Sequence, residues 1–345
     1  MKQLIATAFK EVTLVEAESP VLKPGEVLAQ TLVAGVCGSD LHAVQNLHPF
    51  VPLPYKPGHE VVGIIREVAP DVTGFKVGDR ITVEPDLPCW NCKPCKTGNE
   101  NLCENLQFFG CGYQQGGMSE FWTLSAKRLH LIPGEFSDEQ AALIEPLSTP
   151  VHANKLAFLG NKDLSGKSVV ILGCGTIGLL TLVAAKYFNA KKIVMTDLIE
   201  EKRARALRLG ADAVLDAGSS TIVNDVRTEL GESADVVFDC VALQPTVNQA
   251  VQMADKGGIV VIVGVPEKEV TIPLPIIQDH QIRIQGSATY LPADYKDSIA
   301  LIASGALDTQ EFVTAVFPME KSQEAFDSAL LGDQVKVLIR FSSAD

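Results

Sequence analysis

A glycine-rich turn between an apolar segment and a helical one constrains this chain of 345 residues more than any other feature. Residues 168–172 read Ser-Val-Val-Ile-Leu, and residues 173–178 continue as Gly-Cys-Gly-Thr-Ile-Gly. The stretch 168–185 carries no charge over 18 residues, which is long enough to raise the question of a membrane span. Its three glycines argue against a span, and they favour a buried strand, a tight turn and a helix over about residues 176–188.

The same turn has the spacing and the context of a dinucleotide-binding fingerprint. Gly173 permits the tight turn, Gly175 lets the backbone approach a pyrophosphate, and Gly178 brings the helix close to the strand. The helix N-terminus adds free N–H groups and a positive dipole end. Asp197 ends the next predicted strand 19 residues after Gly178, where a carboxylate binds ribose hydroxyls and repels the extra phosphate of NADP. These features favour a dinucleotide site over a turn that binds nothing, and they favour NAD over NADP as the dinucleotide.

Strands alternate with helical stretches after about residue 153, which is typical of a parallel sheet with crossover helices. The predicted strands are 169–172, 192–196, 213–215, 236–239 and 259–263. Before about residue 133 the chain has short β-like runs instead, such as 27–33 and 61–65. A helical stretch at 296–304 and a terminal strand at 335–339 are expected to rejoin the first domain. The predicted fold class is α/β, with a β-rich domain and a doubly wound nucleotide domain.

The charge balance excludes one broad class of partner. The chain has 42 acidic and 29 basic residues, a formal net charge of -13, which opposes binding to nucleic acid. The apolar stretch after Met1 ends by Lys10 without the cleavage pattern of a secretory signal. We therefore expect a cytoplasmic protein that does not enter a membrane.

Four of the eight cysteines cluster within 15 residues, at Cys89, Cys92, Cys95 and Cys103. Four thiolates with this spacing on a loop suit a closed tetrahedral zinc site in a reducing compartment. An iron–sulfur cluster is the alternative, but the ferredoxin pattern has three residues before its last cysteine, and here the gap is seven. Because four sulfur ligands leave no open position, this zinc is predicted to be structural.

Any catalytic metal must then be held elsewhere, and the dispersed candidates are Cys37, His59, Glu60 and Glu145. A catalytic zinc takes few protein ligands and keeps an exchangeable water, and a thiolate, an imidazole and a carboxylate meet that demand. Their separation in the sequence does not show that they converge. A buried cysteine and a core histidine are an equally good explanation, so the residues alone leave both open.

Taken together, these motifs resemble the zinc-dependent medium-chain alcohol and polyol dehydrogenases over essentially the whole chain. Cys-Gly-Ser-Asp-Leu-His at 37–42, Gly-His-Glu at 58–60, the four cysteines, Glu-Pro-Leu-Ser at 145–148 and the glycine fingerprint occur in the family's order. That order is more specific than any one motif. The resemblance is strongest to the sorbitol, butanediol and threonine dehydrogenase branch, which carries a carboxylate near zinc at the place of Glu145.

The resemblance implies a GroES-like catalytic domain made of residues 1–153 and 288–345, with a Rossmann NAD-binding domain at 154–287. It implies two zinc ions per chain. Carried over by position, Cys37 and His59 ligate the catalytic zinc, and Glu60 and Glu145 ligate it directly, through water or in alternation. The family's habit also implies a homo-oligomer, either a tetramer or a dimer.

The resemblance also implies roles in proton transfer and coenzyme binding. Ser39 and His42 match the family's proton relay, although a helix cap and a surface histidine would explain them too. Lys202 and Arg203 lie close enough to Asp197 to leave the strictness of coenzyme choice open. Beside the glycines and Asp197, the expected coenzyme contacts are Thr176, Ile177, Lys202, Val263, Gly264, Val265, Ala288 and Thr289.

The expected reaction moves a hydride between NAD and a secondary hydroxyl of a polyol or vicinal diol, which becomes a ketone. Ala43 and Thr289 stand where sorbitol dehydrogenases often carry a tyrosine and an arginine, and residues 286–290 are nearer to butanediol dehydrogenases. L-Threonine 3-dehydrogenase and a general secondary-alcohol dehydrogenase are alternatives. A non-catalytic redox sensor that binds NAD and zinc is an alternative of another class, but it would leave Cys37 and His59 without a purpose.

Overall fold

The computed structural model describes residues 1–48, 51–266 and 268–342, and these residues form two compact units. The first unit comprises residues 1–145, 291–303 and 309–345. The second unit comprises residues 146–290 and 304–308. Each unit has its own sheet and its own core.

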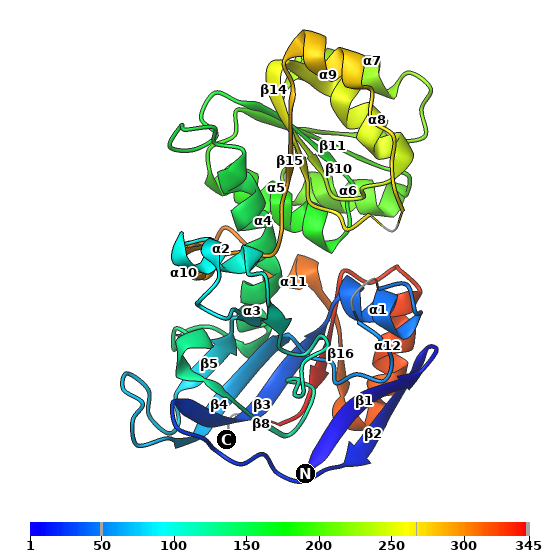
Figure 1. Ribbon diagram of the computed structural model, residues 1–345. Coiled ribbons are helices and arrows are strands. Elements are labelled where there is room, and N and C mark those ends of the chain that lie inside the picture. The colour runs from blue at the N-terminus through cyan, green and yellow to red at the C-terminus, as the bar shows by residue number, and fades with distance from the viewer. Residues whose placement is uncertain (49–50, 267, 343–345) are drawn as a thin grey trace. The chain divides into compact units, whose positions relative to one another are not determined.

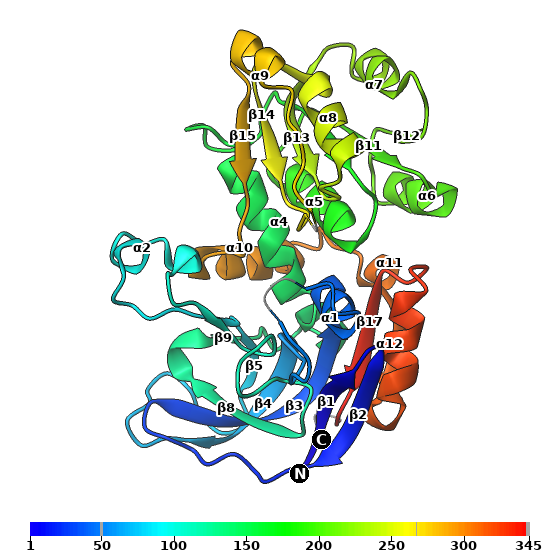
Figure 2. The same ribbon diagram turned by 45° about the vertical axis from the view of Figure 1, so that its right-hand side comes forward.

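The β-like runs of the first unit form a mostly antiparallel sheet of seven strands among the described residues (Figure 2). The strands are β3 Glu26–Val36, β4 Glu60–Val68, β5 Arg80–Val83, β8 Phe121–Ser125, β9 Leu129–Leu131, β16 Val313–Pro318 and β17 Lys336–Arg340. Their order is β16-β17-β3-β4-β5-β9, and β8 also pairs with β3. The C-terminal strand β17 therefore pairs antiparallel with β3, with Val337 opposite Val36.

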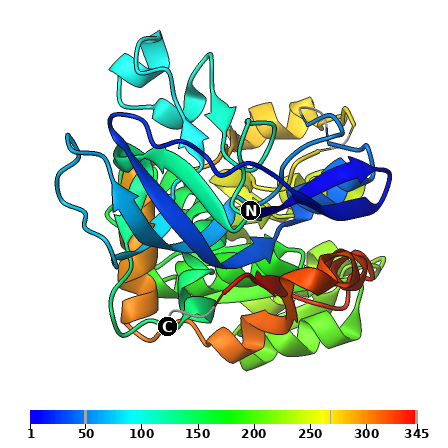
Figure 3. The ribbon, with the colours of Figure 1, turned by 90° about the horizontal axis from the view of Figure 1, so that it is seen from below.

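Two-stranded sheets and short helices also occur in the described part of the first unit. β1 Lys2–Ala8 pairs with β2 Glu11–Glu16, and β6 Asp86–Leu87 pairs with β7 Gln107–Phe108. The helices are α1 Gly38–Val44, α2 Lys93–Lys96, α3 Asp138–Ala141, α10 Pro292–Ala303, α11 Thr309–Phe312 and α12 Ser322–Leu330, and the short 3-10 helices are η1 Glu100–Leu102, η2 Ala126–Arg128 and η3 Met319–Lys321. The segment with α2 and η1 stands out as a lobe, drawn in cyan in Figure 3.

Alternating apolar side chains of the long strands build the core of this unit, because successive residues of a strand point to opposite faces. Val27 and Ala29 of β3 are fully buried, as is Trp122 of β8. Trp122 Nε1 donates to Thr31 Oγ1 at 3.0 Å, so the one polar atom of the indole is satisfied. A Cβ at Gly63 would lie 2.9 Å from the Trp122 ring, so glycine there leaves room for it.

The alternating strands and helices of the second unit form a parallel sheet of six strands among the described residues (Figure 1). The strands are β10 Ser168–Leu172, β11 Lys192–Asp197, β12 Ala213–Asp216, β13 Ala234–Asp239, β14 Ala254–Ile262 and β15 Arg283–Gly286. Their order is β12-β11-β10-β13-β14-β15, so the direction of winding reverses between β10 and β13. In such sheets dinucleotides bind outside the carboxyl ends of the strands, at the point of reversal.

Helices alternate with these strands along the chain and cover much of their apolar surface. They are α4 Ile144–Leu156, α5 Thr176–Tyr187, α6 Glu200–Arg208, α7 Ile222–Leu230, α8 Gln244–Met253 and α9 Leu274–His280. α7 buries Ile222, Val226 and Leu230, which lie one turn apart on a single face. They share a core cluster with Val170 of β10 and Val237 of β13.

The structure confirms the predicted α/β class. The five strands predicted after residue 153 are present, and residues 168–185 divide into β10, a turn and α5. No helix in the described ranges is both long enough and apolar enough to cross a membrane. The edge strand β15 was not predicted, because its Arg-Ile-Gln-Gly sequence, exposed at all four residues, has no apolar pattern.

Candidate functional site

Cys37, His59 and Glu60 meet at the ends of two paired strands. Cys37 follows β3 and precedes α1, while His59 and Glu60 stand at the start of β4. Antiparallel pairing places Gly35 of β3 directly opposite Glu60. One ligand atom from each of the three residues lies within 4.8 Å of the other two, and His59 and Glu60 are buried. The fold thus brings a thiol, an imidazole and a carboxylate to one point.

Two glycines make this convergence possible. A Cβ at Gly35 would lie 2.0 Å from Glu60 Oε2, so any other residue there would displace the carboxylate. Gly58 has a φ of +108°, and a Cβ on it would lie 2.2 Å from the backbone nitrogen of Met118. The Gly-His-Glu motif therefore needs its glycine for the backbone as well as its two side chains.

Asp40 is a buried partner of this cluster and was not among the predicted site residues. Its side chain is fully buried, Oδ2 accepts from the Cys37 backbone N–H at 3.0 Å, and Oδ1 accepts from Tyr55 Oη at 3.0 Å. Oδ1 also lies 3.9 Å from His59 Nδ1. At this distance the carboxylate acts on the imidazole through its charge and not through a hydrogen bond. The signal was present in the Cys-Gly-Ser-Asp motif, where the aspartate stands three residues after the cysteine.

The ring of His59 is held on several sides. Phe108 of β7 packs against it edge to face, with ring centroids 5.6 Å apart, and Ser39 Oγ lies 3.4 Å from Nε2. Nδ1 has no hydrogen-bond partner among the described residues. Burial by itself would lower the pKa of His59, but the negative groups of Asp40, Cys37 and Glu145 outweigh it and raise the pKa well above its usual value. A field that favours a cation here also suits a metal ion.

Lys336 is a second partner that the sequence did not reveal. Its Nζ lies 2.6 Å and 2.7 Å from the two carboxylate oxygens of Glu60, and it donates to the Val36 carbonyl at 3.3 Å. Lys336 is 3% exposed and Glu60 is 0% exposed, so the ion pair is buried. Lys336 opens β17, 276 residues after Glu60, and only the pairing of β17 with β3 brings the two together. The carboxylate is therefore shared between the lysine and the cluster.

The other predicted residues of this site lie on two helices of the chain. Glu145 stands in the first turn of α4 and is 6% exposed, and its charge acts on His59 and on the nearby thiol of Cys111. Among the described residues Glu145 is outside the 4.8 Å group of Cys37, His59 and Glu60. Ser39 and His42 lie on α1 directly after Cys37, with His42 in its last turn.

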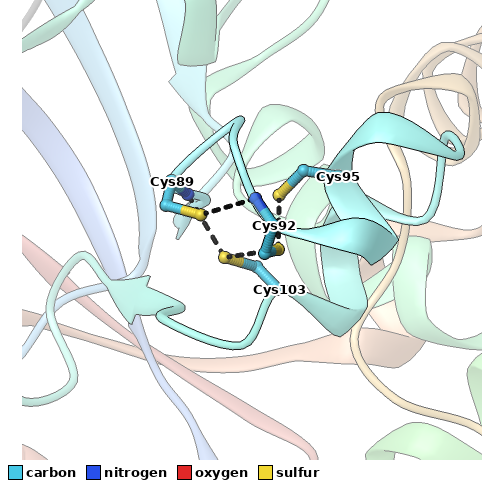
Figure 4. A group of neighbouring side chains, drawn as sticks. All are labelled: Cys89, Cys92, Cys95 and Cys103. Atoms are coloured by element: carbon cyan, nitrogen blue, oxygen red, sulfur yellow. Dashed lines mark hydrogen bonds between the residues drawn. The ribbon is translucent and has the colours of Figure 1, made fainter.

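The four clustered cysteines also converge, as Figure 4 shows. One sulfur from each of Cys89, Cys92, Cys95 and Cys103 lies within 4.8 Å of the others. Backbone N–H groups of Cys89 and Asn105 donate to Cys103 Sγ at 3.2 Å and 3.3 Å. Hydrogen bonds from the backbone of Asn91 and Cys92 lower the pKa of Cys89 to about 6. Sulfurs that accept from N–H groups are suited to the thiolate form that binds zinc.

Arg128 connects this lobe to the rest of the first unit. Its guanidinium forms ion pairs with Glu84 beside β5 and with Glu100 of η1, and it lies 5.2 Å from the centroid of the Trp90 ring. Arg128 is 2% exposed and Glu84 is 1% exposed. His130 completes the group through a 3.0 Å contact with Glu84 Oε2. The charge-assisted contact with Glu100 therefore anchors the lobe to the rest of the first unit.

The glycine turn lies between β10 and α5, as the fingerprint predicts. Gly173 has a φ of +95°, and a Cβ on Gly178 would lie 1.9 Å from the Gly173 carbonyl oxygen. Gly175 precedes the helix, and a Cβ on it would meet nothing within 4 Å, so the backbone there is open to an approaching group. Thr176 and Ile177 form the first turn of α5, and the N-terminus of a helix suits a phosphate.

Asp197 ends β11 and faces this turn. Its Oδ2 accepts from the Cys174 backbone N–H at 2.8 Å, and its Oδ1 accepts from the Ile199 N–H at 2.9 Å. Arg203 lies beside Asp197, because its guanidinium donates to the Asp197 carbonyl at 2.8 Å, and it also lies 3.8 Å from Asp216 Oδ1. Lys202 stands beside it on α6.

The remaining predicted coenzyme residues follow the next strands of the sheet. Val263, Gly264 and Val265 come directly after β14, at its carboxyl end. Ala288 and Thr289 come after β15, and Thr289 has a φ of 44°. The hydroxyls of Ser287 and Thr289 are buried without a hydrogen-bond partner in the part of the chain that the structure describes. Unsatisfied polar atoms at the carboxyl edge of a doubly wound sheet fit a site that a dinucleotide fills.

Two family models match this chain in complementary places. The model described as "Alcohol dehydrogenase GroES-like domain" matches residues 23–134, and the one described as "Zinc-binding dehydrogenase" matches residues 176–304. The D-xylulose reductase of Saccharomyces cerevisiae is 33% identical over 92% of this chain and 90% of its own. The sorbitol dehydrogenase of Bacillus subtilis is 32% identical over 96% of this chain and 94% of its own.

A solved structure agrees with these relatives. The crystal structure of 2R,3R-butanediol dehydrogenase from Bacillus subtilis is 29% identical, has a TM-score of 0.90 and covers 99% of both chains. The fold, the cysteine cluster and the sequence relatives define one class of protein. The chain belongs to the zinc-dependent alcohol and polyol dehydrogenase family and is an oxidoreductase.

Proposed function

We propose that this enzyme transfers a hydride between NAD and a secondary alcohol, either a polyol or a vicinal diol, to give a ketone. The convergence of Cys37, His59 and Glu60 within 4.8 Å carries this proposal. Support comes from relatives named for xylulose, sorbitol and butanediol. Glu145 adds a second carboxylate close enough to act on His59.

The catalytic metal in this proposal is zinc, held by Cys37 and His59 with help from Glu60 and Glu145. The donor set fits, because it combines a thiol, an imidazole and carboxylates inside a negative field. Bound zinc supplies the Lewis acidity that lowers the pKa of a substrate hydroxyl. Cys89, Cys92, Cys95 and Cys103 would hold the second zinc, which has a structural role.

The chain's own residues orient the site and move the proton. The charge of the Asp40 carboxylate acts on His59, whose Nδ1 lies 3.9 Å from Asp40 Oδ1, and Lys336 keeps Glu60 beside the cluster. Ser39 Oγ lies 3.4 Å from His59 Nε2. Ser39 Oγ is therefore proposed to accept the proton that the substrate hydroxyl loses. His42, one turn further along α1, is proposed to pass the proton to solvent.

The coenzyme in this proposal is NAD, which accepts the hydride at its nicotinamide. Its pyrophosphate would lie on Gly175, Thr176 and Ile177, and its adenosine ribose on Asp197. Arg203 Nη1 contacts the Asp197 carbonyl and Asp216, so this nitrogen is already engaged next to the proposed ribose site. Further contacts are proposed at Gly173, Gly178, Lys202, Val263, Gly264, Val265, Ala288 and Thr289.

The substrate preference follows from two missing donors. Ala43 is fully buried in α1 and offers no hydroxyl, and Thr289 offers a much shorter side chain than an arginine. Distal hydroxyls of a six-carbon polyol would lack these partners. Without a polar partner for such a hydroxyl, a site selects less strongly for substrates that carry it. A vicinal diol or a small secondary alcohol therefore fits better than sorbitol.

The organisation proposed for the whole protein is that of a cytoplasmic homo-oligomer, either a tetramer or a dimer. The catalytic domain would comprise residues 1–153 and 288–345, and the NAD-binding domain residues 154–287. Among the described residues β15 pairs on one side only, and its neighbourhood exposes Val265 at 60% and Leu274 at 60%. An open strand edge with apolar neighbours favours pairing with a second copy. Light scattering that gives the mass of one chain would contradict this.

A substrate panel tests the proposed function. We expect kcat/KM with NAD to be highest for 2,3-butanediol or 2-butanol, lower for sorbitol and lowest for ethanol. Ethanol leading the series would overturn the secondary-alcohol assignment. Threonine leading it would favour a threonine 3-dehydrogenase, and no turnover with any alcohol would favour a non-catalytic sensor.

A further inference from the structure

The carboxyl end of β13 is a junction of three segments in the second unit. β13 ends at Asp239, and residues 240–243 form the loop before α8. β10 and the glycine turn lie on one side of this strand, and β14 lies on the other. This is where the strand order reverses, so it is the edge at which a dinucleotide binds.

The buried carboxylate of Asp239 accepts hydrogen bonds from the backbone of this loop. The carboxylate is 0% exposed, and its Oδ1 accepts from the backbone N–H groups of Val241 at 3.0 Å and Ala242 at 2.8 Å. Its Oδ2 accepts from Thr246 Oγ1 at 2.9 Å, in the first turn of α8. Ala242 has a φ of 59°, a backbone conformation that an alanine rarely adopts. The carboxylate therefore holds a loop that would not keep this shape by itself.

The backbone of the same residue ties the neighbouring strand to the loop. The Asp239 carbonyl accepts from the N–H groups of Val263 at 2.9 Å and Gly264 at 3.0 Å. On the other side, the Cys240 N–H donates to the Leu172 carbonyl at the end of β10 at 3.0 Å. Asp239 and Cys240 thus join the end of β13 to the ends of β14 and β10.

Val241, the residue that Asp239 fixes, is packed between two glycines. A Cβ on Gly173 would lie 2.7 Å from Val241 Cγ2, and a Cβ on Gly264 would lie 2.8 Å from the Val241 carbonyl carbon. Both glycines belong to segments expected to touch the coenzyme. A shift of Val241 would therefore move the glycine turn and the end of β14 together.

We propose that Asp239 is a positioning residue for the coenzyme, which acts by fixing Val241 against the glycine turn and the end of β14. This inference rests on the proposed use of NAD. No contact between Asp239 and the coenzyme is needed, because the carboxylate is buried beneath the loop. Its effect is on coenzyme affinity, through the preorganisation of the surface that binds it.

Three variants of the full-length holoenzyme separate positioning from general stability. Asp239→Ala removes all three acceptor contacts. Asp239→Asn keeps an oxygen for Val241 and Ala242, and its amide can donate to Thr246 Oγ1, which then donates to the Leu243 carbonyl 3.0 Å away. Asp235→Ala is the matched control on the opposite end of β13, where a carboxylate accepts from the Ser168 N–H at 2.9 Å and pairs with Lys167.

The measurement is the dissociation constant of NADH by fluorescence titration, with KM for NAD and kcat measured in parallel. We expect roughly tenfold weaker binding for Asp239→Ala, with KM raised more than kcat is lowered, because the surface loses its preorganisation. Asp239→Asn should stay within about threefold of the unmodified enzyme, and Asp235→Ala within about twofold, since distant sites act independently.

Folded Asp239→Ala with unchanged NADH affinity would overturn the inference and leave the proposed function standing. Equal weakening in Asp235→Ala would overturn it as well, because the effect would then be one of general stability. If Asp239→Ala does not fold, Thr246→Val takes its place, and unchanged affinity in that variant overturns the inference. Failure of the unmodified enzyme to bind NADH would overturn both the inference and the proposed coenzyme.

Discussion

Glu60 shows how a single residue in this site depends on another far along the chain. Its two oxygens contact Lys336 Nζ at 2.6 Å and 2.7 Å, and both side chains are buried. A buried charge whose partner is removed is left uncompensated, and the cost of breaking such a pair is much larger than the net value of forming it. Lys336 thus keeps an anion in place beside the cluster of Cys37 and His59.

Replacement of Lys336 with methionine should therefore be strongly destabilising. We expect Lys336→Met to lower the free energy of unfolding of the first unit by about 3–5 kcal/mol, the cost of stranding a buried charge. Tryptophan fluorescence during chemical denaturation reports this, since both tryptophans, Trp90 and Trp122, lie in the first unit. Lys2→Met is the matched control, because Lys2 pairs with Glu320 at the surface. A loss no larger than that of the control would contradict the account.

Asp197 is the residue that we propose sets coenzyme choice in the second unit. We expect Asp197→Ser to lower the preference for NAD over NADP by roughly tenfold to a hundredfold, as a charged hydrogen-bond acceptor is lost. The ratio of the two kcat/KM values measures it. Asp212→Ser is the control, because Asp212 caps the opposite end of β11 through the Ile193 N–H at 2.7 Å. Use of NADP by the unmodified enzyme with equal efficiency would show that Lys202 or Arg203 dominates.

The four-cysteine lobe is the element that we expect to depend most on the proposed structural zinc. α2 has four residues and η1 has three, too few for helices that are stable alone. The lobe's described contacts with the rest of the unit include the pairing of Arg128 with Glu100 and its packing on Trp90. Zinc binding to four thiolates would therefore supply much of the lobe's folding free energy.

Loss of one thiolate should show this dependence. We expect Cys103→Ser to reduce the zinc content of pure protein from two ions per chain to one, and to lower the melting temperature, because a closed site contributes folding energy. Elemental analysis and thermal denaturation measure the two effects. Cys240→Ser, in the second unit, should keep both ions. One zinc in the unmodified protein, with the same content in Cys103→Ser, would contradict the structural assignment.

Short motifs predicted the elements of this protein better than they predicted the contacts between them. The glycine turn, Asp197 and the five strands after residue 153 follow from local patterns, because strand, turn and helix have different periods. β15 could not be found in that way, because its Arg-Ile-Gln-Gly sequence is exposed throughout. The convergence of Cys37 with His59 also depends on pairing between strands, which local patterns do not encode.

At the scale of the whole molecule, residues that support the proposed ligands can come from segments far away in the sequence. Lys336 reaches Glu60 only because β17 pairs with β3, and nothing near either residue in the sequence indicates that contact. Asp40 was within reach of prediction, since it stands in the same motif as Cys37. Asp239 was not, because its role depends on loops after three different strands.

The proposed mechanism requires that Cys37 and His59 hold a zinc ion on which hydride transfer to NAD depends. The most direct test follows NADH formation from 2,3-butanediol in the purified enzyme before chelation, after chelation and after zinc is returned. We predict that activity disappears with the metal, returns with zinc and does not return in Cys37→Ser. Turnover that persists after complete removal of zinc, or in Cys37→Ser at the rate of the unmodified enzyme, would contradict the account.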